Sequence, residues 1–116
     1  MTQQDAWPWP DRLDGAVAAP ESHRVIFEND QIRVLEVVLE PGQREPEHTH
    51  ARPSVMVVTQ ATKIRYFRGA RLMFESVEDE PPGTREPRWM EAEGPHSVEN
   101  IDDHAYRAYR VELKPQ

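Results

Sequence analysis

Two histidines separated by one residue, His48 and His50, are the residues of this sequence best suited to bind a metal ion. They precede an apolar run at residues 55–58 that is typical of a β-strand, and residues two apart in a strand project from the same face. Neutral imidazole is the commonest metal ligand in proteins, so the pair predicts two ligands directed into one space. A third candidate, His96, lies just before another strand-like segment. Antiparallel strands distant in sequence often become neighbours, and we therefore expect His96 to join the pair.

The segments around these histidines resemble the two sequence signatures of the cupin superfamily. Segment 42–50, a glycine followed after five residues by His-Thr-His, resembles the first signature. Segment 94–100, Gly-Pro-His followed after three residues by asparagine, resembles the second. Either segment alone is a weak signal, but both in this order, separated by strands, are fairly specific. The resemblance implies an all-β fold, a cupin-type jelly-roll β-barrel of antiparallel strands.

The resemblance also implies a metal held by His48, His50 and His96. Members of the family usually carry a glutamate ligand separated from the second histidine by three or four residues, where this chain has Ser54 and Val55. A fourth ligand is therefore missing or comes from elsewhere in the chain. The absence of that carboxylate raises the net charge of the site by one unit, which favours an anionic or chelating substrate or a metal-bound hydroxide.

Three imidazoles around a divalent ion leave positions open for water or substrate, as in a catalytic site. Iron, manganese, nickel, zinc and copper all accept imidazole, so the sequence does not identify the metal. The resemblance adds that some three-histidine cupins are Fe(II) dioxygenases. We therefore expect a metal-binding cupin that acts on a small organic molecule, with dioxygenase-type oxidation as the leading chemistry. The alternatives are a cupin that binds or senses a small ligand without turnover, and a metal-dependent isomerase or lyase.

Four further residues are candidates for the substrate pocket. Arg52 keeps the parity of the two histidines and is suited to pair with a substrate carboxylate, although Pro53 makes that parity unreliable. Ser54 stands where the family carboxylate is expected, and Met56 continues the same face of the strand. Trp89 is expected to reach the cavity from another strand. The remaining histidines, His23 and His104, show no comparable sequence context.

Composition limits the other classes of function. The chain has 116 residues, which corresponds to one domain, and it contains no cysteine, so disulfides and thiolate metal sites are excluded. A net charge of -7 argues against general nucleic-acid binding, which needs a basic face. No stretch is long and apolar enough for a membrane span, and the first residues do not resemble a secretory signal. We therefore expect a cytoplasmic protein whose partner is a small molecule, with no nucleic-acid or membrane partner.

Residues 1–22 read as an extended N-terminal arm, and residues 23–116 as the barrel domain. The Trp-Pro-Trp-Pro run at residues 7–10 does not fit inside a helix or a central strand. We expect the arm to lie across the barrel or a partner subunit and to bury its indole rings. This arm, together with strands that are apolar on both faces, predicts a homodimer.

The remaining pattern predicts about eight to ten short strands and no helix of convincing periodicity. An acidic, proline-rich stretch at residues 78–83 is expected to be a surface loop. The predicted strands occupy residues 25–27, 32–39, 55–60, 63–67, 71–77, 88–91 and 105–113.

Overall fold

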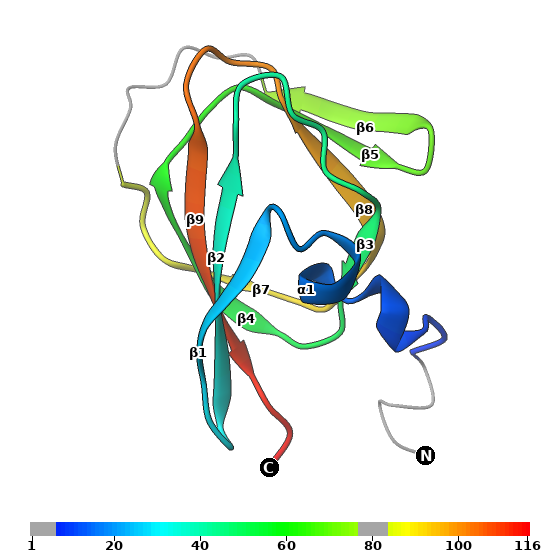
Figure 1. Ribbon diagram of the computed structural model, residues 1–116, viewed down its shortest axis with the longest axis vertical. Helices are drawn as coiled ribbons and strands as arrows, with labels where there is room; N and C mark the ends of the chain where they lie inside the picture. The colour runs from blue at the N-terminus through cyan, green and yellow to red at the C-terminus, as the bar shows by residue number, and fades with distance from the viewer. Residues whose placement is uncertain (1–6, 77–83) are drawn as a thin grey trace.

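Nine β-strands and two short helical turns form the part of the chain that the computed structural model describes, residues 7–76 and 84–116 (Figure 1). The turns are a 3-10 turn, η2 (Asp11–Leu13), and α1 (Gly15–Ala18). The strands are β1 (His23–Glu28), β2 (Ile32–Leu39), β3 (His48–His50), β4 (Ser54–Gln60), β5 (Ile64–Arg68), β6 (Arg71–Ser76), β7 (Arg88–Met90), β8 (Glu93–Asn100) and β9 (Tyr106–Leu113). The predicted loop at 78–83, residue 77 of a predicted strand and residues 1–6 of the predicted arm lie outside the described residues.

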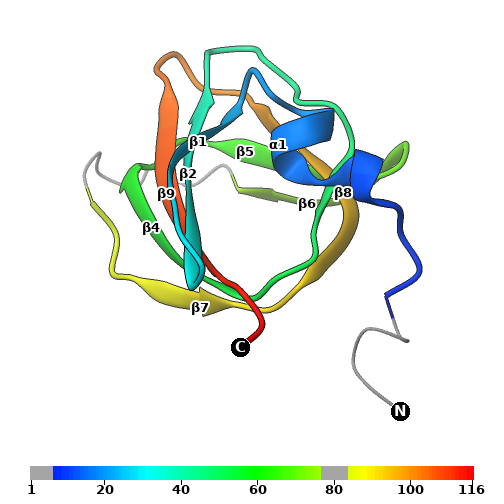
Figure 2. The same cartoon turned by 60° about the horizontal axis from the view of Figure 1, so that its bottom comes forward.

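The strands form two antiparallel sheets that face each other (Figure 2). One sheet has the order β1-β2-β9-β4-β7 and the other the order β3-β8-β5-β6. The prediction of an all-β fold of antiparallel strands is confirmed. Among the described strands, the edges β1 and β7 of the first sheet do not pair with the edges β3 and β6 of the second, so the hydrogen bonding does not close into a barrel. Within the same residues, no helix is long and apolar enough to cross a membrane.

Alternation along the central strands places the core between the sheets. In β2, Leu35, Val37 and Leu39 are buried and the residues between them are half-buried, as expected for side chains that alternate across a strand. Val37 packs with Met56 of β4 and Ala108 of β9 in the core cluster. Since β9 pairs with both β2 and β4, it supplies the middle of the larger sheet.

An irregular pairing between β3 and β8 allows a proline to lie inside β8. His48 is paired with His96 and His50 with Glu93, so two steps along β3 correspond to three along β8. The extra residue makes a bulge, and a bulge is a place where a strand accepts a proline that cannot donate a hydrogen bond. For this reason β8 begins at Glu93 and includes His96, whereas the sequence pattern placed His96 before the strand.

The N-terminal segment is not extended throughout, as η2 and α1 show. No proline interrupts residues 11–19, and the Gly-Ala-Val-Ala segment Gly15–Ala18 forms a helical turn where it packs against other elements. The segment runs beside β3, where Asp14 makes a parallel bridge with Thr49. Trp9 remains 37% exposed, and its ring lies over Gly94 of β8. The segment therefore docks onto the edge of the smaller sheet.

Candidate metal centre

A cavity of about 330 Å³ lies between the two sheets. Four of its lining residues are the histidines His23, His48, His50 and His96. Its apolar lining includes Val37, Met56, Ile64, Phe74, Met90 and Tyr106. Its buried or half-buried charged residues are Glu45, Glu93 and Arg110. A pocket of this size with an apolar body and a few polar groups is suited to a small organic molecule.

Strand β3 and its partner β8 bring three of the histidines together. The ring centroid of His48 is 5.0 Å from that of His50 and 4.5 Å from that of His96. His50 and His96 have centroids 5.3 Å apart. All three side chains are buried. The structure thus places the three histidines singled out in the sequence around one space, and their role as metal ligands stays a prediction.

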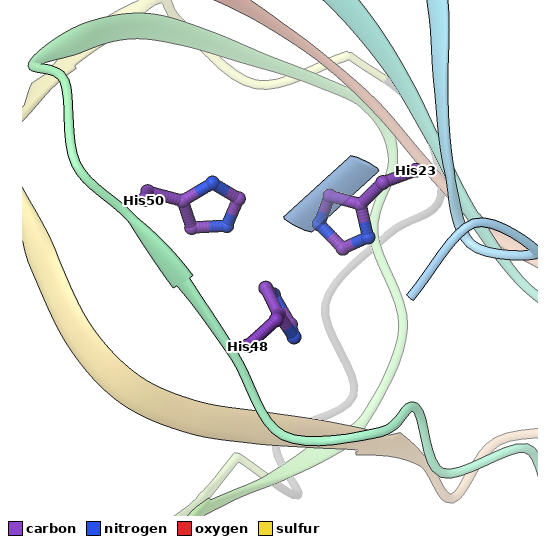
Figure 3. Close-up of side chains that lie close together, drawn as sticks. All are labelled: His23, His48 and His50. Carbon is purple, nitrogen blue, oxygen red and sulfur yellow. The ribbon is translucent and has the colours of Figure 1, made fainter. Parts of the chain in front are cut away.

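His23, the first residue of β1, also points into this space, although its sequence context did not indicate it. Its ring centroid is 4.5 Å from that of His48 and 5.2 Å from that of His50. Each of His23, His48 and His50 offers a ligand atom, and these three atoms lie within 4.8 Å of one another, a spacing that could hold a metal ion (Figure 3). The only sequence signal for His23 was its position at the start of a strand, which does not reveal what the strand lies beside.

Hydrogen bonds on the outer nitrogens orient the imidazole rings. Nδ1 of His48 lies 2.9 Å from the Pro46 carbonyl oxygen, and Nδ1 of His96 lies 2.7 Å from the Gly94 carbonyl oxygen. A carbonyl oxygen only accepts, so Nδ1 carries the hydrogen in both rings and Nε2 keeps a free lone pair. Nδ1 of His23 lies 2.9 Å from Ser22 Oγ.

The electrostatics of the site favour neutral imidazoles. Burial is the main cause that lowers the pKa of His23 to about 2 and that of His48 to about 4, with neighbouring histidines adding to both shifts. Burial likewise lowers the pKa values of His50 and His96. Nε2 of His48 is buried and has no hydrogen-bond partner among the described residues. Neutral rings with unpaired inward nitrogens are what a divalent transition metal requires, so the residues fit such an ion.

The position of the family carboxylate is occupied by a buried hydroxyl. Ser54 is fully buried and accepts a hydrogen bond from Arg110 Nη1 at 3.3 Å. Arg110 also donates to Glu93 Oε1 at 2.7 Å. Burial opposes ionisation of Glu93, but Arg110 and His96 outweigh it and lower the pKa of Glu93. Arg110 is therefore neutralised by Glu93, and Ser54 is part of this structural network.

Glu45, which the sequence analysis did not single out, is a buried part of the site. Its carboxylate accepts hydrogen bonds from Ser22 Oγ at 3.0 Å and from the Val98 amide at 3.2 Å. It also lies 3.5 Å from His23 Nδ1 and 3.7 Å from His48 Nε2. Burial raises the pKa of Glu45 to about 7, against the opposing effect of these hydrogen bonds. Its carboxyl group is thus suited to exchange a proton near neutral pH.

Of the four residues predicted to line the substrate pocket, one lines the cavity and three lie outside it. Met56 lines the cavity. Ser54 does not line it, and Arg52 lines a second hollow outside β3, beside Trp7 and Glu112. Arg52 does not continue the face of His48 and His50, because β3 ends at His50 and the chain bends before β4 begins at Ser54. Trp89 is 51% exposed, and its indole donates to Glu91 at 2.7 Å outside the cavity.

Comparison with solved structures identifies the fold. A cupin domain from Bordetella pertussis Tohama I has a TM-score of 0.65 at 18% sequence identity, covering 80% of this chain and 92% of that chain. An RmlC-like cupin family protein with a double-stranded β-helix fold, from Methanocaldococcus jannaschii, has a TM-score of 0.52 at 12% identity, covering 78% and 77%. The polyketide cyclase RemF from Streptomyces resistomycificus has a TM-score of 0.52 at 18% identity, covering 78% of this chain and 63% of that chain.

No protein-family model and no curated protein matches the sequence. The structural similarity nevertheless shows that the chain has the fold of a small cupin domain, so the predicted resemblance is confirmed at the level of fold. The chain combines this fold with a three-histidine group that could hold a metal.

Proposed function

We propose that this protein is a metal-dependent cupin that acts on a small organic molecule bound in the cavity between the sheets. The observation that carries the proposal is the buried imidazole cluster, in which Nε2 of His48 has no hydrogen-bond partner among the described residues. Buried polar atoms are normally satisfied, and an unpaired lone pair facing other imidazoles is explained by a metal ion. His23, His48 and His50 would hold the ion, and His96 lies close enough to take part.

A bound divalent ion would supply Lewis-acid or redox chemistry at one end of the cavity. The protein supplies the rest of the environment. Met56, Met90 and Phe74 give the cavity an apolar lining that accepts a hydrocarbon body. Tyr66 also lines the cavity and donates a hydrogen bond to Glu93 at 3.1 Å, which positions its ring against His96. The substrate would therefore carry a polar group toward the histidines and an apolar group toward the methionines.

Dioxygenase-type oxidation is the leading chemistry within this proposal. It is supported by a ligand set made of neutral imidazoles, which suits iron as well as manganese, nickel or zinc. Isomerase or lyase chemistry is the second candidate, and the position of Glu45 favours it. This buried carboxyl lines the cavity and lies 3.7 Å from His48, so it could take or return a substrate proton.

The first experiment is elemental analysis of the purified, untagged protein beside a His48→Ala, His96→Ala double variant. We expect a near-stoichiometric transition metal in the wild type and none in the variant. His104→Ala tests the second group that could hold an ion, Asp102, Asp103 and His104 in a partly exposed turn, and it should leave the metal content unchanged. A wild-type protein that carries no metal, and that Fe(II), Mn(II), Ni(II) and Zn(II) neither bind nor stabilise against heat, would remove the metal-dependent function. A cupin that only binds or senses a ligand would then be the remaining candidate.

A second experiment separates the two chemistries. Oxygen consumption by the iron-loaded protein with diketone, thiol or catechol-like substrates would support oxidation. Product formation from such compounds without oxygen uptake would support isomerase or lyase chemistry.

The homodimer and the cytoplasmic location expected from the sequence are also proposals. Exposed apolar residues on β1, Val25, Ile26 and Phe27, support a second copy packing on this sheet edge. Sedimentation of a monomer at micromolar concentration would count against the dimer, and cell fractionation tests the location.

A further inference from the structure

His50 differs from the other three histidines in how its outer nitrogen is held. In His23, His48 and His96, Nδ1 lies 2.7 to 2.9 Å from an oxygen of the protein. Nδ1 of His50 is buried and has no hydrogen-bond partner among the residues that the structure describes. Metal-binding histidines almost always donate their second nitrogen to a carboxylate, a carbonyl or water, since that bond fixes the ring. The missing partner of His50 therefore needs an explanation.

Glu112 of β9 presents an unpaired oxygen to this nitrogen. The side chain of Glu112 is 1% exposed, and its Oε2 atom has no hydrogen-bond partner among the described residues. This oxygen lies 3.7 Å from His50 Nδ1. A water about 2.8 Å from both atoms would make its two hydrogen bonds at an angle of only about 83°, far below the tetrahedral angle, so a direct hydrogen bond is the better-aligned contact. A shift of less than about 1 Å would join the two unpaired atoms in a direct hydrogen bond.

We propose that Glu112 is the positioning residue of His50: it accepts a hydrogen bond from Nδ1–H and so directs the lone pair of Nε2 toward the metal. This inference rests on the proposed metal function and deepens it. All four imidazoles would then have the same arrangement, with Nδ1 bound outward and Nε2 free inward. Glu112 does not touch the metal or the substrate in this role, and it acts only through His50.

The location of Glu112 relates it to the family carboxylate that this chain lacks after its His-Thr-His segment. Ser54, which stands at the expected position of that carboxylate, is the direct cross-strand partner of Glu112 in the β4–β9 pair. A negative charge is thus retained one strand away, on the outer side of the histidines. There it would partly offset the positive charge of a bound ion while leaving one more coordination position open.

Arg33 holds the Glu112 carboxylate in place. Its Nε atom donates to Glu112 Oε1 at 2.6 Å, and its two terminal nitrogens donate to Asp14 at 2.8 and 3.0 Å. Such a bidentate pair fixes the guanidinium plane, and therefore the direction of Glu112. Asp14 is followed by Gly15, where a Cβ atom would lie 3.1 Å from His50 Cε1. The same short segment therefore anchors Arg33 and packs against the His50 ring.

The test compares the wild type with Glu112→Gln in two measurements. The first is the tautomer of His50 in metal-free protein at pH 7.5, read from long-range ¹H–¹⁵N NMR correlations. We expect Nδ1–H in the wild type. In E112Q the side-chain oxygen can still accept from Arg33, so the amide NH₂ faces His50, and we expect Nε2–H. The second is Zn²⁺ affinity by calorimetry, which should fall about 10- to 100-fold in E112Q.

Glu36→Gln is the matched control, because Glu36 forms an exposed ion pair with Arg24 on the same sheet and should change neither measurement. The tautomers of His48 and His96 should stay the same in E112Q, which separates a local effect from general loosening. A wild-type His50 in the Nε2–H form, or an E112Q protein with an unchanged tautomer, would overturn the proposal. If E112Q does not fold, the wild-type tautomer decides the question alone.

The NMR measurement needs no metal, so the two proposals can fail separately. A wild type that does not bind Zn²⁺ but shows the Nδ1–H tautomer would contradict the metal-dependent function and leave the Glu112–His50 bond standing. Asp14→Asn offers a milder variant that keeps Glu112 and weakens its support through Arg33. It should lower Zn²⁺ affinity less than E112Q does, and an equal or larger loss would contradict the role assigned to Glu112.

Discussion

His48 and His96 lie directly opposite each other across the β3–β8 pair, and their ring centroids are 4.5 Å apart. The bulge that follows this pair along β3 sets His50 opposite Glu93 instead of Gly94, the first residue of the second cupin-like signature. His23 approaches the same rings from the other sheet. The site is thus built across both sheets, and each histidine can be tested by itself.

Single substitutions should distinguish a three-histidine from a four-histidine site. We expect His48→Ala to lower Zn²⁺ affinity by more than the roughly 10- to 100-fold typical of residues that only support a ligand. His23→Ala and His96→Ala should each give a loss of similar size if both rings bind the ion. Calorimetry with Zn²⁺ measures all three, and His104→Ala is the control. A variant of His23 or His96 with wild-type affinity would exclude that ring as a ligand.

The stability of the metal-free protein should fall in acid. The histidine pKa values in the folded protein are lowered by burial, to about 2 for His23 and about 4 for His48, whereas an unfolded histidine has a pKa of 6.5. Below pH 6.5 the unfolded chain therefore binds protons that the folded chain does not, and stability decreases as the pH falls. Each such histidine contributes a slope of up to about 1.4 kcal/mol per pH unit.

Glu45 has the opposite effect on how stability changes with pH. Burial raises its pKa from 4.5 to about 7, so in this window the folded chain holds a proton that the unfolded chain releases. One carboxyl group offsets the effect of only one histidine, so acidification should still lower the free energy of unfolding. Urea denaturation in EDTA at pH 7.5 and pH 5.5 measures it. Equal stability at both values would contradict the buried, neutral state of the histidines.

Gly15→Ala should destabilise the protein, although alanine is normally the better residue in a helical turn. The added Cβ would lie 3.1 Å from His50 Cε1, 3.2 Å from His23 Cδ2 and 3.4 Å from His48 Cδ2. Overpacking of this kind costs about 1–3 kcal/mol in the free energy of unfolding, and Zn²⁺ affinity should fall with it. Val17→Ala, at a position 61% exposed in the same turn, should stay within about 0.5 kcal/mol. Urea denaturation of both variants gives the comparison, and a neutral or stabilising G15A would mean that the turn does not pack against the rings.

Glu93→Gln should lower stability by about 1–3 kcal/mol, because it removes the charge that neutralises buried Arg110. The pair is short, at 2.7 Å, and the Arg110 side chain is 7% exposed. Glu91→Gln is the control, since the partner of Glu91 is the exposed indole of Trp89. Denaturation curves at pH 7.5 should separate the two variants. Equal curves would show that Arg110 finds another acceptor.

The parts of the fold that depend on local pattern could be predicted from the sequence. The alternation of Leu35, Val37 and Leu39 indicates both a strand and its buried face, and the structure has β2 at the predicted residues. The two cupin-like signatures also indicated which histidines would become neighbours, since they carry a known relation between strands. Their role as metal ligands awaits the experiments above.

Other features depended on contacts that no local pattern reveals. His23 is an ordinary strand residue until the start of β1 faces the histidines of β3 across the cavity. Glu45 sits in a polar segment that becomes buried under Ser22 and Val98. The helical turn α1 forms where it packs on β3 rather than from a long helical pattern. Strand parity predicted that Arg52 would point the same way as His48 and His50. Arg52 lines a different hollow, because the chain leaves β3 before that residue.

The central place of β9 has a consequence for how the protein is made. On the ribosome, β2 and β4 emerge long before the strand that joins them, and until then they have no common partner in the larger sheet. The same late strand brings Arg110 and Glu112 to the histidines. Such long-range pairing slows folding and leaves unpaired strand edges exposed meanwhile. We therefore expect nascent chains stalled before Tyr106 to be captured by chaperones or degraded, and translation through Leu113 to be the step that commits the domain to its native state.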